Sequence, residues 1–351
     1  MVAISNVISP KGLTRLVAVL FLLLSLIIVG CKSDTSETEV ADKVVSAETS
    51  SVESEADSNK ENIDIHLISS GEEPRQLLRY ALLHEQAADY NMKMKMDIGM
   101  KIDDTQMPVQ SMPWITTTMG VSSSKIDESS SSINALYKDI KVESDGEQIS
   151  AIVKAMEDSM AFLKGIEINY SVDSKGNVGE IEVVEKSPMP PQVKQMITQM
   201  NQSLSKSYVL FPDEAIGVGG KWKNHMKDFD SGGLKVDLEA TYLVKSLSKD
   251  GVELEAEITT LVKEQLMPST PQAGEIKVLP SKNVSKSTIR INFSDVMPES
   301  DLEQNFKQLM EVSMPTPPAS PPADGSNQEE TTKKQLIETD MNMIVKMEKV
   351  S

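Results

Sequence analysis

The 351-residue sequence contains a single cysteine, Cys31. A chain with one cysteine can form no internal disulfide, so its stability must come from a packed core. Histidine is also scarce, since His66, His84 and His225 are the only three and lie far apart in the sequence. Neither an H-E-x-x-H, a G-x-S-x-G nor a Walker-type phosphate motif occurs. These absences predict a non-enzymatic protein with no cofactor and no histidine-based metal site.

The sequence contains fewer basic than acidic residues. Lysine and arginine number 35 against 53 aspartate and glutamate residues, which gives a net charge of −18 at pH 7. Such a surface repels nucleic acids and anionic lipid head groups. A nucleic-acid partner is therefore not expected.

The chain also lacks an apolar run long enough to cross a membrane. Its longest run, 16–30, follows Lys11 and Arg15. At a rise of about 1.5 Å per residue this run is shorter than a hydrocarbon core of about 30 Å. Residues 1–30 are therefore predicted to be an export signal.

The end of this run carries the most specific motif of the sequence. Ile28, Val29, Gly30 and Cys31 resemble the lipobox of bacterial lipoproteins. The resemblance implies that Cys31 is acylated, that the chain is cleaved just before it, and that the protein is a cell-envelope lipoprotein held to the membrane by lipid. The residue after the cysteine is Lys32, and in such lipoproteins an aspartate there favours inner-membrane retention. The expected location is thus the outer membrane, facing the periplasm.

Residues 31–70 are rich in Ser, Thr, Glu and Asp and contain no aromatic residue. Low hydrophobicity and like charge predict a disordered acidic tether. Within it, Ile63, Ile65 and Leu67 alternate, so this stretch is either a first edge strand or an apolar part of the tether. Residues 71–351 remain for one large domain.

Hydrophobicity in this domain alternates with a period of two, which indicates long strands with one wet face. The clearest example has these residues on one face: Tyr90, Met92, Met94, Met96, Ile98, Met100 and Ile102. We expect a mainly β (α+β) fold of about eleven strands, built as a large antiparallel, half-barrel-like sheet with two or three amphipathic helices packed against it.

Turn signals support this expectation. Residues 173–177 separate two strand-like runs, 166–172 and 178–184, and the residues 249–251 form a second tight turn. Helical periodicity predicts helices at 147–164, 190–204 and 299–312. A proline-rich surface loop, 315–330, precedes a final strand within the same domain.

One element joins the two halves of the domain. The sequence YVLFPDEAIGVGGKW, 208–222, resembles an element of an uncharacterised family of bacterial β-rich lipoproteins, and it keeps Pro212, Gly219 and Trp222. That family has no established activity. The layout of the chain is also similar to that of lipoprotein carriers whose unclosed β-barrel holds a lipid acyl chain under a helical lid, although layout alone does not imply function.

The row of methionines at Met92, Met94 and Met96, with Met341 and Met343 near the C-terminus, is the candidate ligand face. Thioethers at alternate strand positions could bind a soft metal such as Cu(I). The chain contains 21 methionines, however, also on the predicted helices. This enrichment favours an apolar wall or core over a metal site, because methionine is an adaptable apolar filler.

The segment 228–239 has a second possible metal pattern. Asp228, Asp230, Gly233 and Glu239 occupy positions one, three, six and twelve of a calcium-binding loop. Alternation from Leu234 onward would carry Glu239 away along a strand, so an acidic hairpin turn explains the same residues. We assign no metal ligand.

Trp114 and Trp222, the only two tryptophans, each stand at the predicted start of a strand. An indole at such a position usually covers the end of a core. It could also line the mouth of a cavity.

Taken together, these patterns predict a membrane-anchored lipoprotein that binds an apolar ligand or an envelope partner through a methionine-lined β face. The first alternative is a structural or assembly lipoprotein that binds another protein. The second is a lipoprotein that binds a soft metal such as copper.

Overall fold

The structure, a computed structural model, describes residues 63–81, 85–144, 150–184, 208–231, 234–267, 275–315 and 332–350. The predicted signal, the lipobox, most of the predicted tether and the predicted helix at 190–204 lie outside the described residues. The proline-rich loop predicted at 315–330 also lies outside them, apart from Pro315.

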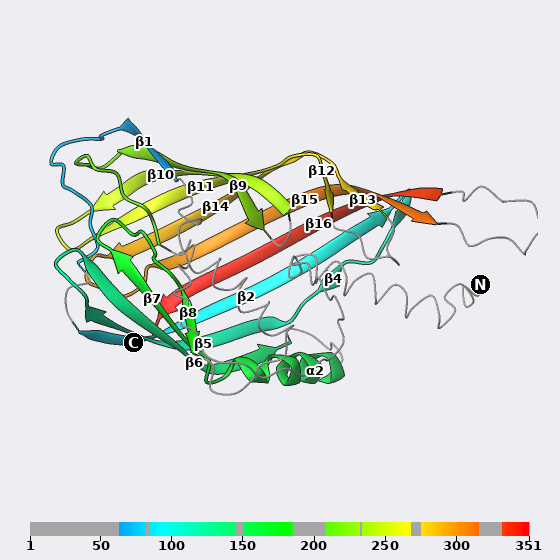
Figure 1. The fold of residues 1–351 in the computed structure, drawn as a ribbon, viewed down its shortest axis with the longest axis horizontal. Coiled ribbons are helices and arrows are strands. Elements are labelled where there is room, and N and C mark those ends of the chain that lie inside the picture. The colour runs from blue at the N-terminus through cyan, green and yellow to red at the C-terminus, as the bar shows by residue number, and fades with distance from the viewer. Residues whose placement is uncertain are drawn as a thin grey trace, which may run out of the picture.

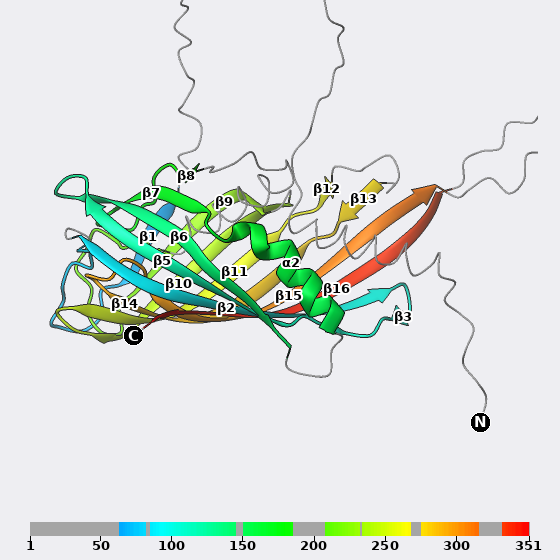
Figure 2. The ribbon, with the colours of Figure 1, turned by 90° about the horizontal axis from the view of Figure 1, so that it is seen from below.

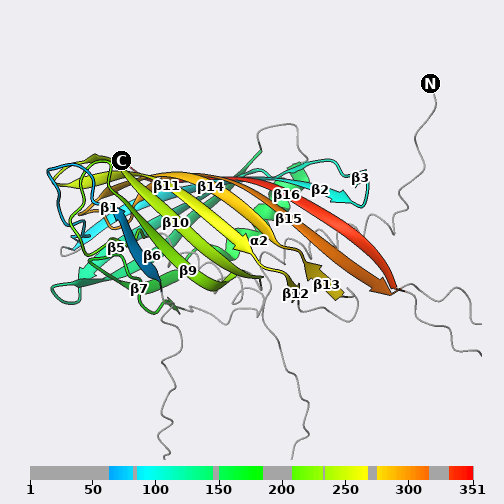
Figure 3. The ribbon, with the colours of Figure 1, turned by 90° about the horizontal axis from the view of Figure 1, so that it is seen from above.

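All described strands belong to one antiparallel sheet, so the predicted mainly β fold is confirmed. Its strands are β1 (Asp64–Ser69), β2 (Gln86–Ile102), β3 (Thr105–Gln106), β4 (Gln110–Ser111), β5 (Trp114–Lys125), β6 (Ser130–Glu143), β7 (Glu167–Asp173), β8 (Glu182–Val184), β9 (Lys221–Ser231), β10 (Leu234–Leu247), β11 (Gly251–Val262), β12 (Gln265–Met267), β13 (Glu275–Val278), β14 (Ser281–Asn292), β15 (Glu299–Pro315) and β16 (Thr332–Lys349). The main order is β1-β9-β10-β11-β14-β15-β16-β2-β5-β6-β7-β8. The sheet is open and not closed into a barrel, and it curves into a trough (Figure 1, Figure 3).

The two longest pairings place the two ends of the domain side by side. β16 pairs with β15 on one side and with β2 on the other, along almost its whole length. Figure 1 shows β16 and β2 next to each other in the middle of the sheet. The last strand of the chain therefore completes the centre of the sheet and not its edge.

The stretch at 63–67, for which two interpretations were open, is part of edge strand β1, which pairs with β9. The folded domain therefore begins before residue 71. The hairpin turns at 173–177 and 249–251 are both confirmed. In the first, the Asp173 carboxylate accepts the backbone N–H groups of Lys175 and Asn177 at 2.8 and 2.9 Å. Gly176 has a φ of 96°, a conformation that glycine adopts without steric cost.

The described residues contain fewer helices than predicted. The helix expected at 147–164 is present as α2 (Ser150–Met160), followed by the 3₁₀ turn η1 (Ala161–Leu163). The helix predicted at 299–312 is wrong, because these residues form strand β15. β15 pairs with β14, β13 and β16, so strand pairing on both sides outweighs the helix propensity of its Glu, Gln, Leu and Met residues.

Two hydrophobic clusters lie on the same face of the sheet, which we call the inner face. The first is aromatic and contains all six tyrosines, at positions 80, 90, 137, 170, 208 and 242. The second lies further along the strands and is aliphatic. Its buried members are Met100, Val236, Val262, Met267, Ile276, Val278, Met310, Val312 and Ile337.

Two irregular segments, 70–81 and 208–220, complete the first cluster. They pair with each other at Gln76 and Ile216. Backbone N–H groups of Tyr80 and Phe211 donate to the turn after β7, while that of Ala81 donates to Phe293 beyond β14. The segments therefore tie one arm of the trough to the other at this end.

The two tryptophans occupy different environments. Trp222 is fully buried in the first cluster, stacked 5.1 Å from Tyr242, and its indole N–H donates to Leu210 O at 3.0 Å. The expectation that it covers the core is confirmed. For Trp114 the expectation is wrong, because its ring lies under the Lys95 ammonium, 5.8 Å from the ring centroid, on the side of the sheet opposite the clusters. We call this the outer face.

Candidate ligand-binding face

The structure brings all five predicted methionines together. Met92, Met94 and Met96 lie at alternate positions of β2, and Met341 and Met343 lie at alternate positions of the neighbouring strand β16. Met96 is directly opposite Met343. Such directly opposed side chains have Cβ atoms about 4.5–5.5 Å apart. The candidate face is thus one continuous surface built from both ends of the domain.

Strand register extends this surface across the trough in two rows. The first runs from Met94 through Val345, Leu302, Ser287 and Ala256 to Tyr242. The second runs from Met96 through Met343, Gln304, Ser285 and Ile258 to Ala240. Each row begins at a methionine and returns to apolar residues at β11, but the first row is polar at β14 and the second at both β15 and β14. The inner face is therefore not uniformly apolar.

The methionine strip, which we define as Met94, Met96, Met341, Met343, Val345 and Leu302, lies between the two hydrophobic clusters. All six side chains are half-buried, and none belongs to either cluster. Met92 packs against the first cluster, whereas Met100 belongs to the second. Between them on the same face of β2, Met94 and Met96 are half-buried, whereas Ile98 is buried. The stretch from Met92 to Ile98, about 20 Å at about 3.4 Å per residue, is therefore only partly covered.

Two polar side chains border the strip. Gln304 of β15 lies opposite Met343 on one side and opposite Ser285 of β14 on the other. Neither Gln304 nor Ser285 has a side-chain hydrogen bond to any described residue. Four residues along β15, by contrast, the Gln308 amide donates to Leu279 O and Leu309 O and accepts from Ser281. Gln308 is held in place, whereas the Gln304 side chain has no such bond within the described part of the chain.

Sequence reasoning missed Gln304 and Ser285. A helix at 299–312, as the sequence predicts, does not place Gln304 on the methionine face. The alternation of Leu302, Gln304 and Phe306 was the signal that could have found it.

Charged side chains are confined to other positions. The two rows are formed by six strands, β2, β16, β15, β14, β11 and β10. The inner-face positions of these strands hold no charged side chain, which for β16 applies from Gln335 to Met347. The outer face of the same strands carries cross-strand ion pairs. Lys93 contacts Glu348 at 2.8 Å, a bond that raises the pKa of Lys93, and Lys307 contacts Asp340 at 3.1 Å. The acidic character of the chain is therefore absent from this part of the inner face.

Helix α2 lies beside β6 and leads into η1 (Figure 2). Its Val153, Met156 and Met160 are half-buried, and Met160 packs against the first cluster. Lys154, Glu157 and Asp158 on the other side of the helix are exposed to solvent. α2 therefore presents an apolar stripe that is not fully covered.

At this face, the methionine thioethers are the only groups that could bind a soft metal among the described residues. No group of three or more His, Cys, Asp or Glu residues able to hold a metal occurs in the described ranges. His66 on β1 and His225 on β9 lie on adjacent strands at the far edge of the sheet, away from β2 and β16. His84 lies outside the described residues.

The acidic segment 228–239 forms the β9–β10 hairpin, so the turn interpretation is confirmed. The Lys263 ammonium contacts both Asp228 and Asp237 at 3.0 Å. Two hydrogen bonds to the Asp237 carboxylate lower its pKa. The larger effect comes from the Asp228 backbone N–H and the smaller from the Lys263 ammonium. Glu239 pairs with Lys223 at 2.9 Å, along the strand and away from the turn. These carboxylates have lysine partners and do not converge as calcium ligands.

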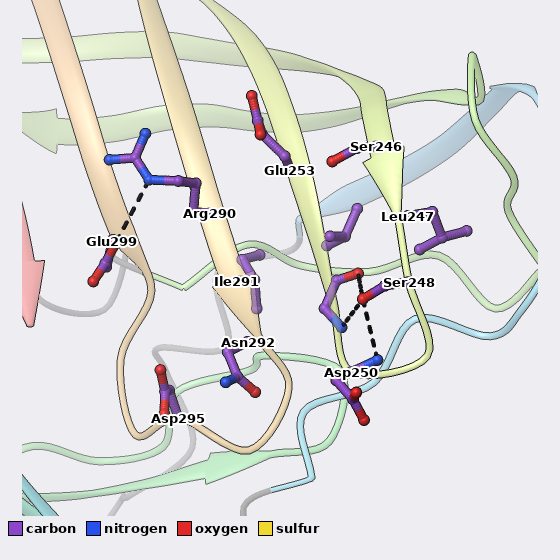
Figure 4. Close-up of a pocket in the computed structure, with 12 residues that line it drawn as sticks. Ser246, Leu247, Ser248, Asp250, Glu253, Arg290, Ile291, Asn292, Asp295 and Glu299 are labelled. Carbon is purple, nitrogen blue, oxygen red and sulfur yellow. Dashed lines mark hydrogen bonds and ion pairs between the residues drawn. The ribbon is translucent and has the colours of Figure 1, made fainter.

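A separate open groove of about 430 Å³ lies near the β10–β11 and β14–β15 turns (Figure 4). Arg290 in its wall contacts Glu299 at 3.5 Å and Asp301 at 2.9 Å. Asp295 contacts Lys349 at 2.8 Å, and the Ser248 hydroxyl accepts the Gly251 N–H at 3.1 Å. Arg290, Asp295 and Glu299 are paired with neighbouring residues, and most of the lining is polar or charged, so the groove offers no apolar surface comparable to the methionine strip.

No helix in the described ranges is long and apolar enough to cross a membrane. Comparison with known proteins finds no family model that matches the sequence. It also finds no curated protein with significant similarity.

Proposed function

We propose that this chain is a lipid-anchored cell-envelope protein, acylated at Cys31, that binds an apolar ligand with an acyl chain on its methionine strip. Binding involves no chemical step. The anchor and the location at the outer membrane rest on the lipobox resemblance alone. The ligand rests on the geometry of the strip.

The observation that carries the proposal is a row of half-buried methionines between two packed clusters. Methionine is unbranched and polarisable, so a methionine surface adapts to flexible apolar guests. A lipid tail spans about half of a hydrocarbon core of about 30 Å. The interval between Met92 and the buried Ile98, about 20 Å, is long enough for such a tail laid along the strand.

Lipids bound by the protein can be identified directly. The full-length chain is purified from membranes and its extractable lipids are measured by mass spectrometry. A Met343→Glu variant should carry much less lipid, because a carboxylate placed in the strip would be desolvated without a partner. Asn342→Glu is the matched control, since Asn342 is exposed on the outer face of the same strand.

Binding can also be titrated with N-phenyl-1-naphthylamine, an uncharged apolar dye, in the chain from Lys32 onward, which lacks the apolar run 16–30 and the acylated cysteine and so avoids detergent. We expect Met343→Glu to weaken dye binding roughly tenfold or more and Asn342→Glu to leave it unchanged. Equal binding by the two variants, or no binding by the parent chain, would rule out the strip as a ligand site.

A further inference from the structure

The chemistry of the inner face restricts the kind of ligand that it can hold. In the two rows that cross the trough, the polar residues are amide and hydroxyl side chains, and none is charged. The whole chain nevertheless carries 88 charged residues, 35 basic and 53 acidic. The absence of charge in these rows is therefore a property of the face and not of the composition.

An anionic head group would find no cation here. The basic side chains next to the strip in sequence, those of Lys93, Lys95 and Lys346, lie on the outer face of their strands. Lys93 contacts Glu348 at 2.8 Å, the Lys95 ammonium lies over the Trp114 ring, and Lys346 lies 4.0 Å from Asp301. Moving a carboxylate or phosphate out of water without a paired cation is strongly unfavourable. A ligand whose polar group enters the face must therefore be neutral there.

A neutral polar group does find partners. Gln304 carries two amide donors and a carbonyl acceptor, and Ser285 carries a hydroxyl that can donate or accept. They are opposite each other on β15 and β14, and neither has a side-chain hydrogen bond to a described residue. Gln304 is also opposite Met343, so a hydrogen-bonding group and the methionine surface are adjacent.

We propose that the ligand is an uncharged amphiphile. Its acyl chain lies along the methionine strip, and a neutral amide, ester or hydroxyl group forms hydrogen bonds with Gln304 and Ser285. This inference rests on the proposed apolar-ligand function and specifies its ligand class.

The test compares two ligands of nearly equal shape, oleic acid and oleamide, at neutral pH. Each displaces N-phenyl-1-naphthylamine from the chain from Lys32 onward, which lacks the apolar run 16–30. We expect oleamide to bind roughly tenfold tighter or more, because the acid is ionised and its carboxylate would be desolvated without a cation. Equal affinity of the two, or tighter binding of the acid, would overturn the inference.

A charge placed at Gln304 should reverse the preference. Gln304→Lys supplies a cation, so this variant should bind oleic acid more tightly than oleamide. Asn305→Lys is the matched control, because Asn305 is exposed on the outer face of β15 and its lysine should leave the preference for oleamide intact. Gln304→Leu should weaken oleamide binding several-fold while dye binding persists. An unchanged preference in Gln304→Lys would count against Gln304 as the polar contact.

The two proposals fail in different ways. Dye binding with no discrimination between amide and acid would remove only the ligand class. Absence of binding by the dye and by both lipids would remove the apolar-ligand function itself.

Discussion

Met96 of β2 and Met343 of β16 are direct cross-strand partners at the centre of the sheet, where the first long strand of the domain meets the last. Neither belongs to a hydrophobic cluster. Two large apolar side chains thus lie at the middle of the inner face without being part of its packed core. Their partial burial distinguishes this part of the inner face from the packed clusters on either side of it.

Stability measurements should show the difference. Met96→Ala and Met343→Ala should each lower the free energy of unfolding by about 1 kcal/mol, because the side chains are already half-buried. Leu254→Ala, at a residue with 0% exposure in the first cluster, should cost about 2–5 kcal/mol. Urea denaturation of the three variants gives the comparison. Equal losses would mean that the strip is packed as tightly as the core.

Replacing sulfur separates the apolar and the metal interpretations. Met96→Leu and Met343→Leu conserve volume and hydrophobicity, so binding of N-phenyl-1-naphthylamine should change little. A thioether site for Cu(I) would instead lose its ligands. Titration of the parent chain and both variants with Ag(I), a stable substitute for Cu(I), checks this. Tight Ag(I) binding that disappears in the leucine variants would favour the copper alternative.

The fold class and the methionine face could be predicted from the sequence because alternation along β2 and β16 is long and regular. The pairing of β2 with β16 could not be predicted in this way. Period-two patterns say which side chains share a face of a strand, but they do not say which strands are neighbours. Met96 and Met343 meet only because β16 returns to the centre of the sheet.

The segment 299–312 shows a different limit. Leu302, Phe306 and Leu309 have helical spacing, while Leu302, Gln304 and Phe306 have strand spacing, so both patterns fit the same residues. In the structure the strand pattern prevails, because β14 and β16 supply hydrogen-bonding partners on both sides. The local sequence contains no information about those partners, and Gln304 was missed as a result.

The two tryptophans provide a matched pair for testing the two faces of the sheet. Trp222→Ala should cost about 3–5 kcal/mol of stability, because it empties a buried site stacked on Tyr242. Trp114→Ala should cost about 1 kcal/mol or less, since it removes mainly the contact with Lys95 on the outer face. Denaturant unfolding of both variants measures the difference. A large loss for Trp114→Ala would place that residue in the core after all.

Alkaline pH should destabilise the first cluster. Burial raises the pKa of Tyr137 and Tyr242 from 10.0 to about 12. Because the folded pKa is raised, the unfolded chain loses these protons first. Stability is therefore fully present below pH 10 and falls between pH 10 and 12, by up to about 1.4 kcal/mol per pH unit for a buried tyrosine such as Tyr242.

Absorbance of ionised tyrosine and circular dichroism, recorded over the same pH range, test this expectation. Tyrosine ionisation should appear together with the loss of sheet structure. Ionisation of all six tyrosines near pH 10 with the sheet intact would contradict their burial in one cluster.

The lipid anchor can be tested independently of the ligand. If Cys31 is acylated, cells grown with labelled palmitate should incorporate the label into the protein, and Cys31→Ala should abolish it. Two or three acyl chains anchor a protein stably where a single chain is marginal, so the variant should also leave the membrane fraction. Lys32→Ser, which keeps the cysteine and avoids aspartate, is the control and should remain acylated and membrane-bound. Continued labelling or membrane attachment of Cys31→Ala would disprove the lipobox assignment while leaving the inner-face predictions untouched, because Met96, Met343 and Gln304 lie in the folded domain beyond residue 63.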